Sequence, residues 1–358
     1  MSQQYMMKGN EALAEAALRA GCRYFFGYPN TAPTEISAYL SKRMPKIGGT
    51  FLQAESEVAA INMVLGASSV GARVMTSSSS QGISLKTEGI SYIAGSDLPC
   101  LIVNVQRGGP GLGGIQPSQA DYFQATKAPG HGDLHIMVFA PASIQEIVDM
   151  VGRAFDKADQ YRMPAMLLAD GALGQMMEPI AFPDESEEKK LPEKPWAATG
   201  TKGNRKPNII NSLYLNPNQL ENSIRERFER YEKIKENEVL YEEVMTDDAD
   251  IVLVAYGITS RICKTAVNKA RQEGIKLGLI RPITLWPFPE KAIAEIASHA
   301  KAFISVEMSM GQMVDDVRLA VNGKCPVHFF GRTGGVIPTP DEVLNVAKEV
   351  LASVGGDR

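Results

Sequence analysis

The sequence predicts an α/β protein with two domains, the first built on a parallel β-sheet that is covered by helices on both faces. Short apolar segments typical of buried strands alternate with segments of helical periodicity from about residue 7 to residue 183, and the alternation resumes near residue 250. A length of 358 residues suits two domains. We therefore expect a first domain at 1–183, a charged linker with a helix at 184–248, and a smaller α/β domain at 249–358.

The elements of the first domain follow from apolar periodicity and from residues that favour helix starts. Strands are expected at 24–27, 50–52, 73–77, 101–106, 136–139 and 165–168. Helices are expected at 10–19, 33–41, 83–95 and 144–157, and within the stretch 53–68, where apolar residues on most of the circumference predict a buried helix. Asn10 suits the N-cap of the first helix, and Pro33 suits the first turn of the second because its φ angle is already helical.

The linker and the second domain have a different composition. The linker contains the segment 218–238, in which acids and bases alternate at helical spacing. Its narrow apolar stripe predicts a solvated helix that docks, between the domains or onto a partner, through Leu220, Ile224, Phe228 and Tyr231. The second domain is expected to contain strands at 250–257, 276–280 and 302–306, a helix at 262–272, and another helix before the last strand.

Composition and spacing exclude several classes of protein. A net charge of −4 gives no general electrostatic reason to bind nucleic acid. No apolar run reaches the ~18–20 residues of a membrane helix, and the N-terminus lacks a basic and then apolar signal pattern, so we expect a cytoplasmic protein that contacts no membrane. The four cysteines form no CxxC pair and the histidines lack a ligand spacing, so no metal site is expected on this chain.

The stretch 53–68 carries two carboxylates, Glu55 and Glu57, at the head of its otherwise apolar helix. Charged side chains at the start of a buried helix are rare unless a partner meets them. Each acid therefore either caps the helix and interacts with its dipole, or faces a ligand. When this stretch is considered without its neighbours, the capping role is favoured for both acids. The neighbouring loops, described next, favour the ligand-facing role instead.

Two polar loops follow strands at the edge where open α/β sheets place their ligands. The loop 27–35 leads from a strand into a helix start, where backbone amides and the hydroxyls of Thr31 and Thr34 suit a carboxylate. For Thr34 a helix-capping role is favoured. The loop 76–82 contains four serines in a row and suits an oxyanion, although its composition by itself favours a solvated turn.

A third loop follows the strand at 101–106. Arg107 is followed by five glycines within seven residues, which lets the backbone approach a ligand closely. The string 109–114 matches GxGxxG, but the residues 115–117 do not start a helix and no acid follows the next strand, so we reject NAD binding. Arg107 is either a structural ion-pair partner or a binder of a carboxylate or phosphate group.

Together these motifs resemble those of a known family. The segments 28–36 (YPNTAPTEI), 55–60 (ESEVAA), 66–73 (GASSVGAR) and 103–110 (VNVQRGGP) occur in the same order in the alpha subunit of 2-oxoacid:ferredoxin oxidoreductases, which the chain resembles from about residue 7 to the C-terminus. The stretch 107–133 is most similar to the branched-chain type, which acts on 2-oxoisovalerate (3-methyl-2-oxobutanoate).

The resemblance implies oxidative decarboxylation of a 2-oxoacid to acyl-coenzyme A, with electrons passed to ferredoxin. The first domain would be the pyrimidine-binding domain for thiamine diphosphate, and the second would resemble the C-terminal domain of transketolase. Glu57 aligns with the family's acid that contacts N1′ of the cofactor's aminopyrimidine, where a buried carboxyl favours the tautomer that deprotonates the thiazolium. Glu55 is the second choice for this contact.

The resemblance also implies how the substrate is held. Thr31 aligns with the threonine that holds the carboxylate or oxo group of the substrate, and Arg107 aligns with the arginine near the substrate and coenzyme A. Tyr28 and Pro29 belong to the same motif as Thr31 and are expected at the cofactor. Two departures from the family's Tyr-Pro-Ile-Thr-Pro motif flank Thr31, namely Asn30 and Ala32.

Two features needed for turnover are missing from the sequence: a Gly-Asp-Gly run followed by Asn, which would hold magnesium and the diphosphate, and a cysteine cluster for electron transfer. The resemblance implies a beta subunit that carries the diphosphate and magnesium half-site and an iron–sulfur cluster. Gamma and ferredoxin-like delta subunits would complete the assembly. Thiamine diphosphate would be shared with the beta subunit, magnesium and the clusters would lie only on partner subunits, and this chain would be active only in the assembly.

Three alternatives remain open. One is the alpha subunit of a 2-oxoglutarate:ferredoxin oxidoreductase. Another is the beta-type subunit of the E1 component of a lipoamide-linked 2-oxoacid dehydrogenase, which shares the domain order and the glutamate, although the Tyr-Pro-x-Thr loop at 28–31 argues against it. The last is a noncatalytic scaffold subunit that retains the fold.

Overall fold

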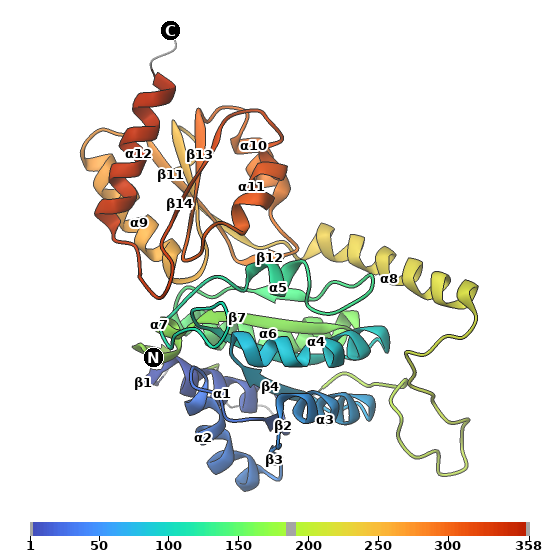
Figure 1. Cartoon of the computed structure of the whole chain (residues 1–358). Helices are drawn as coiled ribbons and strands as arrows, with labels where there is room; N and C mark the ends of the chain where they lie inside the picture. The colour runs from blue at the N-terminus through green and yellow to red at the C-terminus, as the bar shows by residue number, and fades with distance from the viewer. Residues whose placement is uncertain (1–2, 184–190, 356–358) are drawn as a thin grey trace.

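Two β-sheets, each flanked by helices, organise the chain in the computed structural model (Figure 1). The structure describes residues 3–183 and 191–355. The ends of the predicted domains, 1–2 and 356–358, and the opening of the predicted linker, 184–190, lie outside these ranges. The larger sheet has the strand order β12-β6-β7-β5-β4-β2-β3, the smaller one has the order β14-β13-β10-β11-β9, and β1 forms a separate antiparallel pair with β8.

The larger sheet consists mainly of strands from the first half of the chain. Its strands are β2 (Tyr24–Gly27), β3 (Thr50–Gln53), β4 (Val74–Ser78), β5 (Cys100–Gln106), β6 (Met137–Phe139), β7 (Pro164–Asp170) and β12 (Thr284–Trp286). The surrounding helices are α1 (Gly9–Arg19), α2 (Thr34–Arg43), η1 (Met44–Ile47), α3 (Glu57–Ser69), α4 (Ser80–Gly95), α5 (Tyr122–Thr126), α6 (Ile144–Tyr161) and α7 (Gly171–Gln175). The separate pair is β1 (Gln4–Lys8) and β8 (Met177–Ala181).

The smaller sheet lies above the larger one in the view of Figure 1. Its strands are β9 (Tyr241–Val244), β10 (Ile251–Val254), β11 (Leu277–Pro282), β13 (Ala302–Glu307) and β14 (Val327–Gly331). All neighbours pair in parallel except β9, which is antiparallel to β11. Helices α9 (Gly257–Gln272) and α12 (Pro340–Gly355) cover one face, and α10 (Glu290–Ile296) and α11 (Met313–Val321) cover the other. The predicted α/β class is confirmed.

One strand crosses between the two parts of the chain. β12 follows β11 in sequence, but it pairs antiparallel with β6 at the edge of the larger sheet. The expectation of a parallel sheet formed by the first domain alone is therefore wrong at this edge. The three residues of β12 show no alternating apolar pattern, so the sequence gives no signal for a strand there. The strand forms only because the second half of the chain packs against the edge of the larger sheet.

Two predicted helix caps are wrong because the side chains make longer-range contacts. Asn10 is buried inside the first turn of α1, and its amide donates to the carbonyl of Ala32 (2.9 Å) and to the carboxylate of Glu35 (2.8 Å). The residue that precedes α1 is Lys8, which makes no side-chain cap. Thr34 lies inside α2, and its hydroxyl donates back to the carbonyls at positions 30 and 31.

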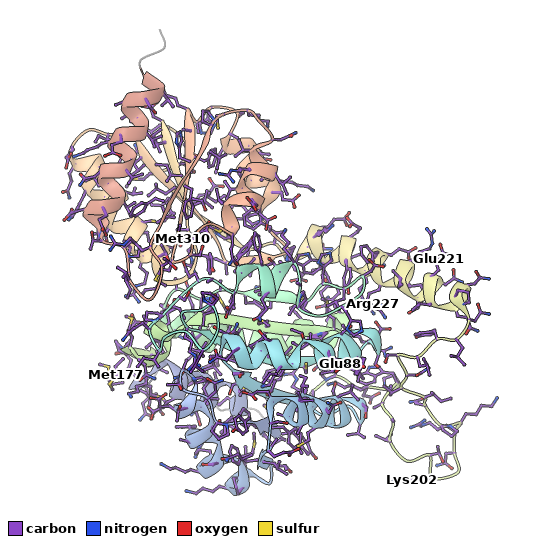
Figure 2. All side chains as sticks on the ribbon, in the orientation of Figure 1. Glu88, Met177, Lys202, Glu221, Arg227 and Met310 are labelled. Atoms are coloured by element: carbon purple, nitrogen blue, oxygen red, sulfur yellow. The ribbon has the colours of Figure 1, made fainter. Side chains whose placement is uncertain are left out.

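The helix predicted in the linker is α8 (Pro217–Asn237), and only its C-terminal half docks on the chain. Tyr231 is buried and its hydroxyl accepts the backbone N–H of His135 (3.2 Å). Arg227, labelled in Figure 2, is also buried and donates to the last carbonyl of α4 (3.2 Å). Phe228 is 38% exposed but packs against the rings of His135 and Tyr231, with ring centroids 6.1 and 5.3 Å apart, whereas Leu220 is 40% exposed near the N-terminal end of the stripe.

Gln119 joins the two parts of the chain close to the larger sheet. Its backbone N–H donates to the carbonyl of Met308 (2.9 Å), and its side-chain amide donates to the carbonyl of Tyr256 (2.8 Å). Its amide oxygen accepts the hydroxyl of Thr259 (2.6 Å) and the N–H of Met308 (3.0 Å). One apolar core continues from the larger sheet to the face of the smaller sheet that α10 and α11 cover. In the ranges 3–183 and 191–355, none of the helices has both the length and the apolar character of a membrane span.

Candidate active site

Four chain segments meet at one edge of the larger sheet. The strands β3, β2, β4 and β5 are neighbours and run parallel, so the loops that follow them emerge side by side. These loops are the three polar loops singled out in the sequence and the head of α3. Open α/β sheets bind their ligands at this edge.

The head of α3 places Glu57 in a buried position. Ser56 is the N-cap, and its hydroxyl accepts the N–H of Ala59 (3.1 Å). Because Ser56 occupies the cap position, the predicted capping role for Glu55 is wrong, and the Glu55 side chain is exposed. Glu57 is 8% exposed, and within the described residues no hydrogen bond reaches its carboxylate. The helix itself is buried on one face only, since Val58 is 44% exposed.

Gly82, in the first turn of α4, lines the space next to Glu57. A Cβ atom on Gly82 would lie 2.8 Å from Oε1 of Glu57, 3.0 Å from Nδ2 of Asn30 and 2.0 Å from Oγ of Ser78. The absence of a side chain at Gly82 therefore allows three loops to converge closely at this point. The hydroxyl of Ser79 donates to the amide oxygen of Asn30 (2.5 Å), which ties the loop after β2 to the start of α4.

The serine-rich segment at the end of β4 is buried, so its interpretation as a solvated turn is wrong. Ser77, Ser78 and Ser79 are at most 2% exposed. Beneath them, Nζ of Lys86 donates to the hydroxyl of Thr76 (2.7 Å) and to the carbonyl of Ser77 (3.1 Å). Burial lowers the pKa of Lys86 from 10.5 to about 7, and the charge of Glu57 opposes that lowering.

Lys86 is not among the site residues predicted from the sequence, although its position carries a recognisable signal. Lys86 lies three residues after Ile83 and four residues before Ile90, which places it on the apolar face of α4. All three side chains are fully buried. A lysine on the apolar face of a helix that starts in a polar loop is therefore a recognisable candidate for a functional group.

Arg107 lies at the end of β5 and is 7% exposed. Its Nε donates to the amide oxygen of Gln81 (3.1 Å), and its backbone N–H donates to the hydroxyl of Ser80 (3.1 Å). No carboxylate pairs with Arg107 in the part of the chain that the structure describes, so nothing here supports a structural ion pair. Its terminal nitrogens make no hydrogen bond there and are available to an anion.

The buried carboxylate of Asp121, which is not predicted from the sequence, is linked to Arg107 through Ser80. Asp121 accepts hydrogen bonds from the hydroxyl of Ser80 (2.7 Å) and from the amide of Asn104 (2.9 Å), and burial raises its pKa. The hydroxyl of Ser80 thus contacts both Asp121 and the backbone of Arg107. These contacts fix the end of β5, and no local motif marks them in the sequence.

The remaining predicted site residues lie on the exposed part of the loop after β2. Tyr28, Pro29 and Thr31 are exposed. The carbonyl of Thr31 accepts the hydroxyl of Thr34 (3.0 Å). The structure therefore brings together Glu57, Gly82 and the side chain of Asn30. Thr31 directly follows Asn30 in the chain. Tyr28 and Pro29 are exposed and are not part of this group of contacts.

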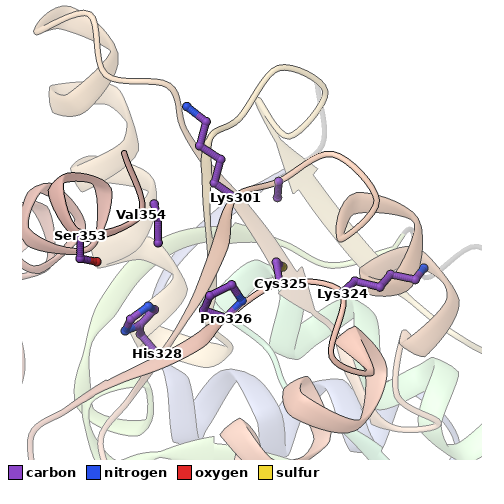
Figure 3. Close-up of a pocket in the computed structure, with 8 residues that line it drawn as sticks. Lys301, Lys324, Cys325, Pro326, His328, Ser353 and Val354 are labelled. Atoms are coloured by element: carbon purple, nitrogen blue, oxygen red, sulfur yellow. The ribbon is translucent and has the colours of Figure 1, made fainter. Parts of the chain in front are cut away.

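A separate shallow cavity of about 610 Å³ lies on the smaller sheet (Figure 3). Lys301, Cys325, His328 and Ser353 are among its lining residues. None of the candidate site residues lines it, so it is distinct from the edge described above. Within the described residues, no group of three or more His, Cys, Asp and Glu side chains is arranged to hold a metal ion.

Two family models match the chain. The model for pyruvate flavodoxin/ferredoxin oxidoreductase, thiamine diphosphate binding, matches residues 15–243. The model for pyruvate:ferredoxin oxidoreductase core domain II matches residues 249–343. The two matches together span both sheets.

Relatives of known name resemble the chain over nearly its whole length. The ketoisovalerate oxidoreductase subunit VorB of Methanothermobacter thermautotrophicus is 50% identical over 96% of this chain and 97% of the relative. The 2-oxoglutarate synthase subunit KorA of Methanothermobacter marburgensis is 37% identical over 96% of this chain and 98% of that protein.

A solved structure has the same fold. The 2-oxoglutarate:ferredoxin oxidoreductase from Magnetococcus marinus, with 2-oxoglutarate, coenzyme A and succinyl-CoA bound, superposes with a TM-score of 0.89 at 28% identity and covers 97% of this chain. The present chain spans 65% of that longer chain. A split-gene transketolase, at 15% identity and a TM-score of 0.62, shares the fold.

Proposed function

The chain belongs to the pyruvate flavodoxin/ferredoxin oxidoreductase family of 2-oxoacid:ferredoxin oxidoreductases, and we propose that it is the alpha-type subunit that supplies the aminopyrimidine half of a thiamine diphosphate site. The proposed reaction is the oxidative decarboxylation of a branched-chain 2-oxoacid to acyl-coenzyme A, with ferredoxin as electron acceptor. The observation that carries the proposal is the buried carboxylate of Glu57, which has no hydrogen-bond partner in the described residues and lies beside the bare Cα of Gly82.

The residues at this edge fit the aminopyrimidine part of the cofactor. A buried carboxylate is costly unless a ligand donor or a shared proton satisfies it. Because Gly82 has no side chain, that carboxylate can lie close to the backbone of α4, together with the amide of Asn30 and the hydroxyl of Ser78. These polar groups would offer the ring further hydrogen bonds.

The side chains have distinct proposed roles. Thiamine diphosphate, when bound, supplies a carbon nucleophile for the keto group and takes up the electrons released on decarboxylation. Glu57 would share a proton with ring nitrogen N1′ and so hold the ring in place. The free guanidinium nitrogens of Arg107 would bind the substrate carboxylate, with the hydroxyl of Thr31 as a second donor. Tyr28 and Pro29 would border the cofactor from the exposed side of the loop.

The proposal requires partner subunits. The beta subunit would carry the diphosphate and magnesium half-site and an iron–sulfur cluster, and gamma and ferredoxin-like delta subunits would complete the path to ferredoxin. Subunit names among the relatives, VorB and KorA, support a multi-subunit assembly. The cysteines Cys22, Cys100, Cys263 and Cys325 are all free thiols, which supports work in the reducing cytoplasm.

A branched-chain substrate is favoured over 2-oxoglutarate by similarity. The ketoisovalerate oxidoreductase subunit is 50% identical to this chain, and the 2-oxoglutarate synthase subunit is 37% identical. The substrate can be assigned by assaying the assembled complex with viologen dye, coenzyme A and either oxoacid. We expect reduction of the dye with 2-oxoisovalerate and much slower reduction with 2-oxoglutarate.

The split site is tested with this chain alone. Because the chain holds no sequence for the diphosphate half, isolated chain should show no calorimetric affinity for thiamine diphosphate in the micromolar range, whereas the assembled complex should bind it. Tight binding by the isolated chain would mean that the site is not divided between subunits. Dye reduction by a complex depleted of thiamine diphosphate would contradict the proposed cofactor.

A further inference from the structure

Two consecutive residues at the start of α4 hold Arg107. The hydroxyl of Ser80 accepts the backbone N–H of Arg107 (3.1 Å), and the amide oxygen of Gln81 accepts its Nε–H (3.1 Å). A guanidinium group has five N–H donors in a planar fork. The contact with Gln81 uses one of them and leaves the four on the terminal nitrogens without a hydrogen bond in the described residues. Arg107 therefore presents one free edge, the pair of terminal nitrogens.

The positive charge of Arg107 has no ion-pair partner within the described residues. Arg107 is 7% exposed, and a buried cation is costly unless an anion meets it. The carboxylate of Asp121 lies two hydrogen bonds away, but it accepts the hydroxyl of Ser80 and the amide of Asn104 instead. The anion that balances Arg107 must therefore come from outside the part of the chain that the structure describes.

Gln81 occupies a position where an acid would be more stable. The N-terminal end of a helix favours a negative charge, yet the first turn of α4 contains no acid. A glutamate has the length of a glutamine, and at position 81 it would also form a charge-assisted pair with Nε of Arg107. Both local effects favour glutamate over glutamine. A residue that departs from local stability in this way indicates a functional constraint, namely that Arg107 stays uncompensated.

We propose that Gln81 is a positioning residue that orients Arg107 without neutralising it, so that the terminal nitrogens bind the carboxylate of the 2-oxoacid. This inference rests on the proposed function and adds the residue that keeps the charge of Arg107 available to the substrate. A carboxylate binds a guanidinium best through two parallel N–H bonds from one edge. Since Gln81 occupies the Nε position, the edge left for that bidentate contact is the one formed by the two terminal nitrogens.

The variant Gln81→Glu separates this role from a structural one, because stability and substrate binding should change in opposite directions. The urea midpoint of the chain should equal or exceed that of wild type. In the assembled complex, the KM for 2-oxoisovalerate should rise about tenfold or more, since the added carboxylate competes with the substrate for Arg107. The kcat and the calorimetric affinity for thiamine diphosphate should stay within about twofold of wild type. An unchanged KM, or an equal loss of cofactor affinity, would overturn the proposal.

Gln160→Glu is the matched control. The amide oxygen of Gln160 also accepts a hydrogen bond from a cation, Nζ of Lys157 (3.1 Å), but it lies on α6, outside the candidate site. This variant adds the same charge beside a cation, and its KM should stay within about twofold of wild type. A KM that rises as much as in Gln81→Glu would show an effect of net charge alone and would overturn the proposal.

Labelling of Arg107 gives a readout that does not depend on activity. Phenylglyoxal modifies guanidinium groups that are not held in an ion pair, and mass spectrometry of the digested, cofactor-free complex measures the rate at Arg107. We expect labelling in wild type, protection by 2-oxoisovalerate, and labelling about fivefold slower or more in Gln81→Glu. An unlabelled Arg107 in wild type, or equal rates in wild type and Gln81→Glu, would contradict the proposal.

A second variant guards against a defect in assembly. If the Gln81→Glu chain does not assemble, Gln81→Met removes the acceptor at similar volume, and the KM for 2-oxoisovalerate should rise about threefold with cofactor affinity unchanged. An unchanged KM in Gln81→Met would again overturn the proposal. Wild-type complex that fails to reduce the viologen dye with any 2-oxoacid would refute the proposed function, whereas turnover with an unchanged KM in the variants would refute only the role of Gln81.

Discussion

Replacing Gly82 with alanine tests whether the position of the Glu57 carboxylate is needed for cofactor binding. The new Cβ atom would lie 2.0 Å from Oγ of Ser78, 2.8 Å from Oε1 of Glu57 and 3.0 Å from Nδ2 of Asn30. All three distances are shorter than ordinary van der Waals contact, so the surrounding side chains must move. Two other glycines of the same helix pair, Gly66 in α3 and Gly89 in α4, provide matched controls.

The size of the effect follows from the local geometry. Alanine gains up to about 1 kcal/mol over glycine inside a helix, and overpacking costs about 1–3 kcal/mol. At Gly66 nothing lies within 4 Å of the new Cβ, so Gly66→Ala should stabilise the chain by up to about 1 kcal/mol. At Gly89 the Cβ would meet Cγ2 of Ile61 at 2.4 Å, so that variant, like Gly82→Ala, should lose about 0–2 kcal/mol net.

The two clashing variants differ in what they displace. Gly89→Ala disturbs the core between α3 and α4, whereas Gly82→Ala displaces Ser78 and the carboxylate of Glu57. Urea unfolding of the chain should therefore show a similar loss of stability for Gly82→Ala and for Gly89→Ala. Calorimetry on the assembled complex should show thiamine diphosphate binding at least about tenfold weaker only for Gly82→Ala. Wild-type affinity in Gly82→Ala would refute the assignment of Glu57 and its neighbours to the cofactor site.

Three further predictions concern charge. Burial lowers the pKa of Lys86 from 10.5 to about 7, so the unfolded state binds more protons than the folded state between these two pH values. The free energy of unfolding should therefore rise with pH across that window, by up to about 5 kcal/mol at about 1.4 kcal/mol per pH unit. Urea unfolding at pH 7, 8.5 and 10 should show this rise in wild type, and a parallel rise in Lys86→Met would refute its origin in Lys86. Burial raises the pKa of Asp170 from 3.8 to about 6, so the protonated side chain favours the folded state. Its contribution to the free energy of unfolding is full below pH 3.8 and is lost as pH rises through 6, a change of about 3 kcal/mol. Unfolding curves from pH 3.5 to 7 should show this change in wild type and not in Asp170→Asn. Arg107→Lys keeps the charge but loses the forked donors, so the KM for the oxoacid should rise about tenfold with cofactor affinity unchanged, and an unchanged KM would remove Arg107 from the substrate site.

Much of the larger sheet could be predicted because its strands carry local signals. Apolar runs bounded by glycine and polar residues mark β2, β4, β5 and β7, and the parallel order follows from their alternation with helices. The head of α3 was also visible, since two acids beside an apolar helix are unusual. What distinguishes them is burial: Glu57 turns inward and Glu55 stays in solvent, as the helical spacing from the cap at Ser56 dictates.

The missed features depend on contacts between distant segments. β12 exists only because the second part of the chain reaches the edge strand β6. Asn10 looks like a cap, but it is drawn inward by acceptors on α2 and the turn before it. The serines after β4 look solvated by composition, but Lys86 and Asn30 satisfy their polar groups from inside the protein. No local pattern contains these partners.

The central claim is that this chain contributes Glu57 to a thiamine diphosphate site, and a matched pair of variants tests it most directly. Glu57→Gln and Glu55→Gln remove the same charge two residues apart, one buried and one exposed. Each variant is assembled with its partner subunits and assayed for viologen reduction with 2-oxoisovalerate and coenzyme A. The account predicts that Glu57→Gln abolishes activity and that Glu55→Gln retains it. Undiminished activity in Glu57→Gln would contradict the account.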